Sequence, residues 1–171
     1  MQTILRALIV VGAIGGAALP ARASWFFQTQ DDPLTDVTTA VLTAPSDSMG
    51  FGLKCWNEPN GAIIISIMTP LPYTDGLASN IPVIIRVDKN KIVSSDFDVI
   101  NIYNIIVFKA SIYEHSEFKD IVDQMAATTN RVVVAIGSQQ VQFPAKGLQA
   151  AYKKWSSACA KALDETQAAK P

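Results

Sequence analysis

Cysteine and histidine are scarce in this chain, which has two cysteines and one histidine among 171 residues. The cysteines, Cys55 and Cys159, lie 104 positions apart, a spacing that matches no zinc-ligand pattern. The sequence also lacks a phosphate-binding P-loop, a dinucleotide fingerprint, a metalloprotease helix and a calcium loop. It therefore predicts no cofactor and no metal centre, and it gives no support to a cofactor-dependent enzyme.

Long apolar runs are absent except near the N-terminus. Ala7–Leu19 is an uncharged, mostly apolar run, shorter than the roughly 20 residues of a membrane-spanning helix. Small residues at 21 and 23 follow it, as in a secretory signal peptide, although an uncut membrane anchor is the alternative. We predict a Sec-type signal peptide over residues 1–23 with cleavage after Ala23, a single exported domain over 24–164 and a frayed tail over 165–171. The expected location is the periplasm or the medium, with no stable membrane span after cleavage.

Basic clusters are absent too. The chain carries 14 Lys and Arg against 15 Asp and Glu, and Lys153-Lys154 is the only adjacent basic pair. Nucleic-acid binding requires a concentrated basic face, because the phosphate backbone supplies most of the affinity. We therefore expect no nucleic-acid partner.

Two cysteines in an exported protein favour a disulfide over a metal site or a catalytic pair. The alternative is a thiol nucleophile at Cys55 with His115 as its base. A reactive thiol needs a positive, partly exposed setting, whereas Cys55 lies in a strand-like pattern beside Trp56. We predict a Cys55–Cys159 disulfide, which would stabilise the fold by about 4–5 kcal/mol in the chain-entropy model.

Strand patterns dominate the chain after the signal. Alternating or β-branched runs predict strands over Val37–Thr43, Phe51–Asn57, Ala62–Met68, Ile81–Asp88, Arg131–Ile136 and Gln139–Phe143, and a strand or strand pair over Val99–Lys109. Asn60-Gly61 predicts a hairpin turn. Helical spacing follows over Phe118–Met125, with Ser116 as its N-cap, and over Leu148–Ala162. The predicted class is α+β: a mostly antiparallel sheet or sandwich with two helices, the C-terminal one disulfide-bonded to an early strand.

The order of several short motifs resembles an exported family. The motifs are Trp25, an Asp-Pro turn leading into a strand, the strand Phe51–Asn57, the strand end with Arg86 and Asp88, a short helix, and Phe143-x-x-x-Gly147-Leu148-x-x-Ala151 running on to Cys159. This order, over about residues 25–160, is similar to that of the VasI/TagO-like family, which includes accessory proteins of type VI secretion clusters. The resemblance implies a periplasmic location and one disulfide, and it brings no catalytic residues.

The chain departs from that family pattern in a lengthened Ser94–Asn104 segment and a proline-rich Pro70–Pro72 loop. A second, less extensive resemblance is to small periplasmic proteins of the invasion-associated locus B type.

Outward strand positions point to a binding function. The predicted partner surface comprises Trp56, Ile64, Met68, Ile84, Arg86 and Asp88. Apolar side chains that stay exposed together mark partner sites, although a sheet covered on both faces is the alternative. We predict a non-enzymatic periplasmic binding or accessory protein whose partner is a protein or a cell-envelope component, and the family resemblance implies a type VI-associated role.

The alternative function is a hydrolase that acts on envelope material. A histidine beside carboxylates can serve as a general base or a metal ligand, and His115 follows Glu114 directly. Asp96 and Asp98 are two positions apart and share a face in an extended chain. The opposing interpretation is a surface histidine at the start of a helix, with the two aspartates as solvated acids.

Overall fold

The computed structural model describes residues 24–35, 37–56, 63–112 and 115–168, with side chains up to Lys161. The predicted signal peptide and the predicted Asn60-Gly61 turn lie outside these residues. The strands are β1 (Phe26–Asp32), β2 (Val37–Ala44), β3 (Gly50–Trp56), β4 (Ile63–Pro72), β5 (Asn80–Val87), β6 (Val93–Ile102), β7 (Ile105–Ser111), β8 (Arg131–Ile136) and β9 (Gln139–Pro144). The helices are α1 (Glu117–Ala126) and α2 (Leu148–Ala168).

All nine strands form one sheet in the order β1-β2-β3-β4-β7-β6-β5-β8-β9. Every neighbouring pair is antiparallel. The predicted α+β class with a mostly antiparallel sheet and two helices is thereby confirmed. The strands follow the order of the chain as far as β4, and then β7, β6 and β5 follow in reverse. Strands β4 and β5 are therefore neighbours in the sequence but are separated by two strands in the sheet.

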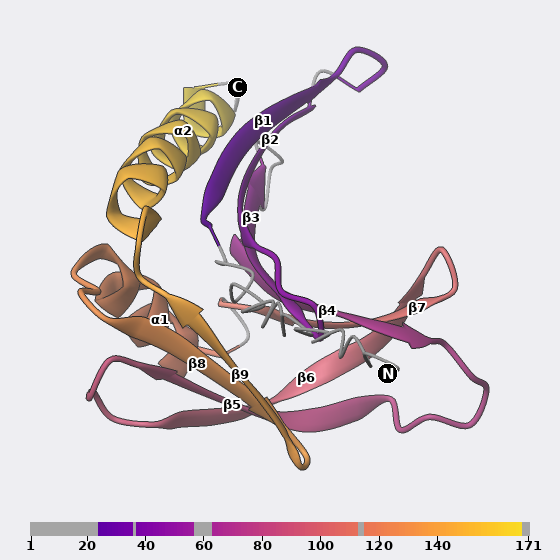
Figure 1. The fold of residues 1–171 in the computed structure, drawn as a ribbon. Coiled ribbons are helices and arrows are strands. Elements are labelled where there is room, and N and C mark those ends of the chain that lie inside the picture. Colours follow the sequence, from indigo (N-terminus) through magenta and orange to yellow (C-terminus); the bar gives the residue numbers. More distant parts are fainter. Residues whose placement is uncertain (1–23, 36, 57–62, 113–114, 169–171) are drawn as a thin grey trace, which may run out of the picture.

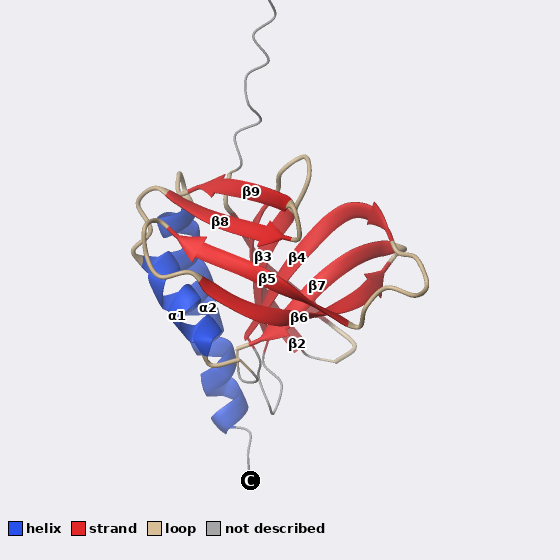
Figure 2. Ribbon diagram, turned by 90° about the horizontal axis from the view of Figure 1, so that it is seen from below, coloured by secondary structure: helices blue, strands red, loops and turns tan. Residues whose placement is uncertain are grey.

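The sheet curls into a half-barrel, and both helices lie on its inner side (Figures 1 and 2). Helix α2 packs against β1, β2 and β3, while α1 packs against α2, β5 and β6. Alternate residues of each strand point to one face, and the inner positions are fully buried in, for example, Leu42, Leu53, Ile65 and Val134. We call the opposite face of the sheet the outer face.

Trp25 joins the two edges of the half-barrel. Its indole Nε1–H donates to the backbone oxygen of Pro144 at the end of β9, at 2.8 Å. Its ring packs edge-on against Phe51, with centroids 5.9 Å apart, and lies 6.2 Å from the ring of Phe143. Because the indole is buried and its N–H is satisfied, Trp25 fixes the start of β1 against the far end of the sheet.

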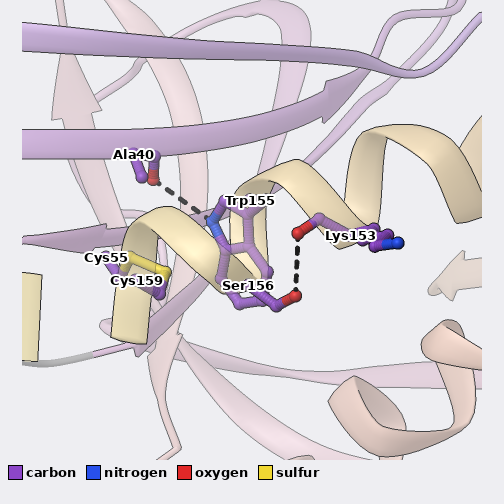
Figure 3. Close-up of a disulfide and its surroundings, with 6 residues drawn as sticks. All are labelled: Ala40, Cys55, Lys153, Trp155, Ser156 and Cys159. Carbon is purple, nitrogen blue, oxygen red and sulfur yellow. Dashed lines mark hydrogen bonds between the residues drawn. A yellow bond between two sulfur atoms is a disulfide. The ribbon is translucent and has the colours of Figure 1, made fainter. Parts of the chain in front are cut away.

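The predicted disulfide is confirmed. Cys55 on β3 is bonded to Cys159 on α2, with their Cα atoms 5.9 Å apart and both side chains buried (Figure 3). One helical turn earlier, the Nε1–H of Trp155 donates to the backbone oxygen of Ala40 on β2, at 3.2 Å. The covalent bond and this hydrogen bond hold α2 against two neighbouring strands.

Proline residues 70 and 72 belong to β4, so the Pro70–Pro72 loop expected from the sequence is wrong. Strand β3 pairs with β4 only as far as Gly50 and Met68. Beyond that point β4 has β7 as its single neighbour, and its register shifts between Met68 and Pro72. Proline lacks the N–H that a central strand must donate, but it is tolerated at such an edge or bulge.

Helix α1 begins after Ser116 as predicted, whereas α2 ends later than the sequence indicated. Ser116 occupies the N-cap position of α1 but makes no capping hydrogen bond with its side chain. The predicted apolar face of α1, which includes Phe118 and Ile121, is buried. The backbone of α2 continues to Ala168, past the boundary predicted after Asp164.

Candidate functional site

A hollow of about 460 Å³ lies on the outer face at one end of β1–β4. We call it the outer hollow. Its lining includes Phe26, Gln28, Thr43, Gly50, Met68 and Pro70, together with the loop between β2 and β3. Phe26 is 55% exposed and Met68 is 40% exposed. Large apolar side chains that stay open around a concave surface are typical of a binding site for an apolar group.

Glycine on β3 provides the space in the outer hollow. Gly50 pairs with Met68 and Gly52 pairs with Ser66 on β4, so both glycines face outward between larger neighbours. A Cβ atom at Gly50 would lie 3.3 Å from the terminal methyl of Met68, and one at Gly52 would lie 3.0 Å from the Ser66 hydroxyl oxygen. A strand glycine commonly marks a close approach to another group, and Gly50, which lines the hollow, lowers the surface between the two apolar walls.

The irregularity in β4 shapes the other wall of the outer hollow. Pro70 cannot donate to β7, and the hydroxyl of buried Thr69 donates to the backbone oxygen of Ile106 instead, at 3.2 Å. Bulges redirect neighbouring side chains and are common beside functional sites. Met68 faces the hollow in the regular register, just before the shift, and Pro70 lies within the shifted segment at the rim, where the carbonyl of Ile106 accepts from Thr69.

The structure brings three of the predicted partner-surface residues onto two neighbouring strands. Trp56, Ile64 and Met68 all face outward on β3 and β4, because Lys54 pairs with Ile64 and Gly50 with Met68. Met68 lines the outer hollow. Trp56 and Ile64 lie toward the opposite end of these strands, where the Lys54 ammonium sits 5.2 Å from the centre of the Trp56 ring.

Ile84 and Arg86 lie apart from that group. Ile84 is 42% exposed on the outer face of β5, but β7 and β6 separate β5 from β4. The guanidinium of Arg86 donates to the backbone oxygens of Lys89 and Asn90, at 3.2 and 3.1 Å. The donors of Arg86 are therefore used to hold the turn between β5 and β6.

Asp88 fastens the end of β5 to the start of β8. Its carboxylate accepts hydrogen bonds from the backbone N–H groups of Thr129, Asn130 and Arg131, at 2.8–2.9 Å. Burial opposes the charged form, but these hydrogen bonds outweigh it and hold the pKa of Asp88 below its ordinary value. Asp88 adopts a left-handed backbone conformation, with φ of 51°. Its role in the described residues is structural.

His115 belongs to a hydrogen-bonded cluster with Ser95 and Glu117. The Ser95 hydroxyl donates to the Glu117 carboxylate at 2.6 Å, and its oxygen lies 3.0 Å from His115 Nδ1. A hydroxyl has a single proton, so His115 Nδ1–H must donate to Ser95. The hydrogen bond from Ser95 also lowers the pKa of Glu117. In a hydrolytic triad the serine donates to the histidine. Here Ser95 lies between histidine and acid, and the cluster attaches the start of α1 to β6.

The predicted carboxylate pair faces away from this cluster. Asp96 and Asp98 are exposed on the outer face of β6, whereas Ser95 points to the inner face with Val93 and Phe97. Glu114 lies outside the described residues. The structure therefore brings neither aspartate to His115, and Glu117 is the carboxylate that it places there.

The described residues contain no group of three or more His, Cys, Asp or Glu placed to hold a metal ion. Within the same part of the chain, no helix is long and apolar enough to cross a membrane. Comparison of the chain with protein-family models, curated proteins and solved structures finds no match.

Sequence reasoning missed most of the outer hollow. Phe26 lies outside every strand predicted from the sequence, and Gly50 and Pro70 carried no binding expectation. One signal was present beside the hollow: Gly52, at an outward position of the strand pattern Phe51–Asn57, indicates space on that face two residues from Gly50. The sequence contained no comparable signal that β1 would line the outer hollow, since Phe26 reaches the hollow only through the pairing of β1 with β2.

Proposed function

We propose that this protein is an exported, non-enzymatic binding protein that holds an apolar group of its partner in the outer hollow. The observation that carries the proposal is the exposure of Phe26 and Met68 on either side of a glycine-floored depression. Burying one large apolar side chain contributes about 1.5–3 kcal/mol. An exported location is supported by the buried disulfide, which persists in oxidising compartments, and by the signal-like residues 1–23.

The partner is expected to present an apolar side chain next to a positive charge. A volume of about 460 Å³ is of the size that binds small ligands and single large side chains. Asp47 is the one charged residue in the described lining, and it lies at the loop between β2 and β3. A carboxylate at the rim of an apolar site favours a cation there and steers its approach.

Site-specific photo-crosslinking tests this proposal. A photo-reactive amino acid at Met68 is compared with one at Ile84, because the two side chains face outward and are 40% and 42% exposed. In cells, the variant at position 68 should form a discrete adduct with one partner, and the variant at position 84 should not. Equal labelling at both positions, or no adduct at position 68, would contradict a site in the outer hollow.

We also propose that the binding serves an accessory role at the cell envelope, of the type VI secretion kind. The support for this role is the motif order shared with the VasI/TagO-like family, from Trp25 to Cys159. Secretion-cluster genes beside the gene for this chain, and a loss of type VI-dependent secretion on its deletion, are the expected observations. A gene without such neighbours and a deletion without this defect would count against the role while leaving the outer hollow proposal intact.

A further inference from the structure

Strand β1 is an end strand of the sheet with little protection along its free edge. It pairs with β2 without interruption from Phe26–Thr43 to Asp32–Val37. It contains no proline, glycine, lysine or bulge, and its only charges, which can also hinder edge-to-edge pairing, are Asp31 and Asp32 at its C-terminal end. All of its side chains except Phe27 are exposed. Within the described residues, the one backbone hydrogen bond to β1 outside the sheet ladder runs from Thr35 N–H to the Asp32 oxygen.

The other end strand is less open to pairing. Strand β9 ends in Pro144, which has no N–H, and the Pro144 carbonyl already accepts from Trp25. Helix α2 packs against the inner side of β1, β2 and β3, so it covers a face of the sheet rather than the outer edge of β1. The free edge of β1 is therefore the position at which another strand can extend the sheet.

From the charges of β1 we infer that its edge pairs with the β1 strand of a second copy of this chain, antiparallel and with the twofold axis at Thr29. In this register Gln28 faces Gln30 of the other copy, and Phe26 and Phe27 face Asp32 and Asp31. No like charges meet. A parallel pairing would instead place Asp31 beside Asp31 and Asp32 beside Asp32, which is destabilising.

The pairing is consistent with the faces of the sheet. Residues directly opposite each other in an antiparallel pair point to the same face, so Gln28 and Gln30 would meet on the outer face and two Thr29 side chains on the inner face. The result is one continuous sheet of two copies, with the two outer hollows on the same side. The interface uses the edge of β1 and does not depend on what the outer hollow binds.

Charge substitutions at Thr29 test the twofold register. Sedimentation velocity of the exported chain, as processed by the cell, should show a concentration-dependent dimer. Thr29→Lys and Thr29→Asp should each be monomeric at a concentration where the native protein is mostly dimeric, because like charges would face each other across the axis. An equimolar mixture of the two variants should restore the dimer, which also shows that both variants are folded.

A matched control lies on the other edge strand. Gln140 on β9 is exposed like Thr29, and Gln140→Lys should leave the dimer unchanged. Three results would each overturn the inference: a native protein that is monomeric at every concentration, a dimer that survives Thr29→Lys, or a mixture of the two charged variants that stays monomeric.

Discussion

At the scale of single residues, a charged side chain on the surface can have its hydrogen-bonding groups occupied within the protein, and those groups are then not available to a partner. Asp88 and Arg86 were predicted to contribute to a partner surface, and the structure uses the hydrogen-bonding groups of both in turns. Met68 was predicted on the same grounds and lies at the rim of the outer hollow. An outward position in a strand does not tell a residue that binds a partner from a residue that stabilises the fold. The backbone groups that bond to Arg86 and Asp88 belong to turns, and the alternation of a strand does not predict those turns.

Asp88 gives a prediction about pH. Its folded-state pKa lies below the unfolded value of 3.8, so the stabilisation is present above about pH 4 and is lost as the pH falls through the folded pKa. Asp88→Asn suits the left-handed backbone but replaces an accepting oxygen with an NH₂ group. We expect a loss of about 1–2 kcal/mol in the free energy of unfolding at pH 7, measured by urea denaturation.

The difference in the free energy of unfolding between the native protein and Asp88→Asn should become smaller below pH 4. Asp96→Asn is the matched control, since Asp96 is exposed on the outer face of β6. It should change the free energy of unfolding by less than about 0.5 kcal/mol. Equal losses for the two variants, or a difference that persists at pH 2, would show that the Asp88 carboxylate does not fasten β5 to β8.

At the scale of elements, the sequence predicted most strands that have a buried face, although it missed the first half of β6, where Val93 and Phe97 are buried, and it missed β1. Strands β2, β3, β5 and β8 show alternation because each is buried on its inner side. Strand β1 reads FFQTQDD and has no buried stripe, since nearly all of its side chains are exposed. The end of β4 was interpreted as a loop because of its prolines, and only the pairing scheme reveals that this part of β4 lies beyond the reach of β3.

Helix α2 supplies a prediction about the disulfide. Thiol titration of the denatured, unreduced protein should find no free thiol in the Cys55–Cys159 pair. Replacing both cysteines with alanine should lower the free energy of unfolding by about 2–5 kcal/mol, because both side chains are buried and the crosslink spans 104 residues. Two free thiols, or a stability unchanged by the double replacement, would contradict a structural bond between α2 and the sheet.

At the scale of the whole molecule, strand order decides which outward residues meet. The class of fold and the bond between α2 and β3 could be predicted from periodicity and from the two cysteines. The distance between Ile84 and Met68 could not, because it depends on β7 and β6 lying between β5 and β4. The outer hollow depends in the same way on β1 lying beside β2, which brings Phe26 to the wall opposite Met68.

The outer hollow can be filled without damage to the fold. Gly50 has an ordinary backbone conformation, and a Cβ there would be tight only against the flexible terminal methyl of Met68, at 3.3 Å, while the Cβ and backbone oxygen of Met68 would lie at ordinary contact distances of 3.7 and 4.0 Å. Valine is favoured in strands, whereas glycine in a strand interior costs roughly 0.5–1 kcal/mol relative to alanine. Gly50→Val should therefore occupy the hollow while leaving the free energy of unfolding unchanged or slightly raised.

The most direct test is the affinity of the partner captured at Met68 for the native protein and for Gly50→Val, measured by calorimetric titration with Ile84→Ser as the control. We predict at least a tenfold weaker binding for Gly50→Val, equivalent to about 1.4 kcal/mol, and native affinity for Ile84→Ser. Native affinity in a folded Gly50→Val protein would show that the partner binds elsewhere.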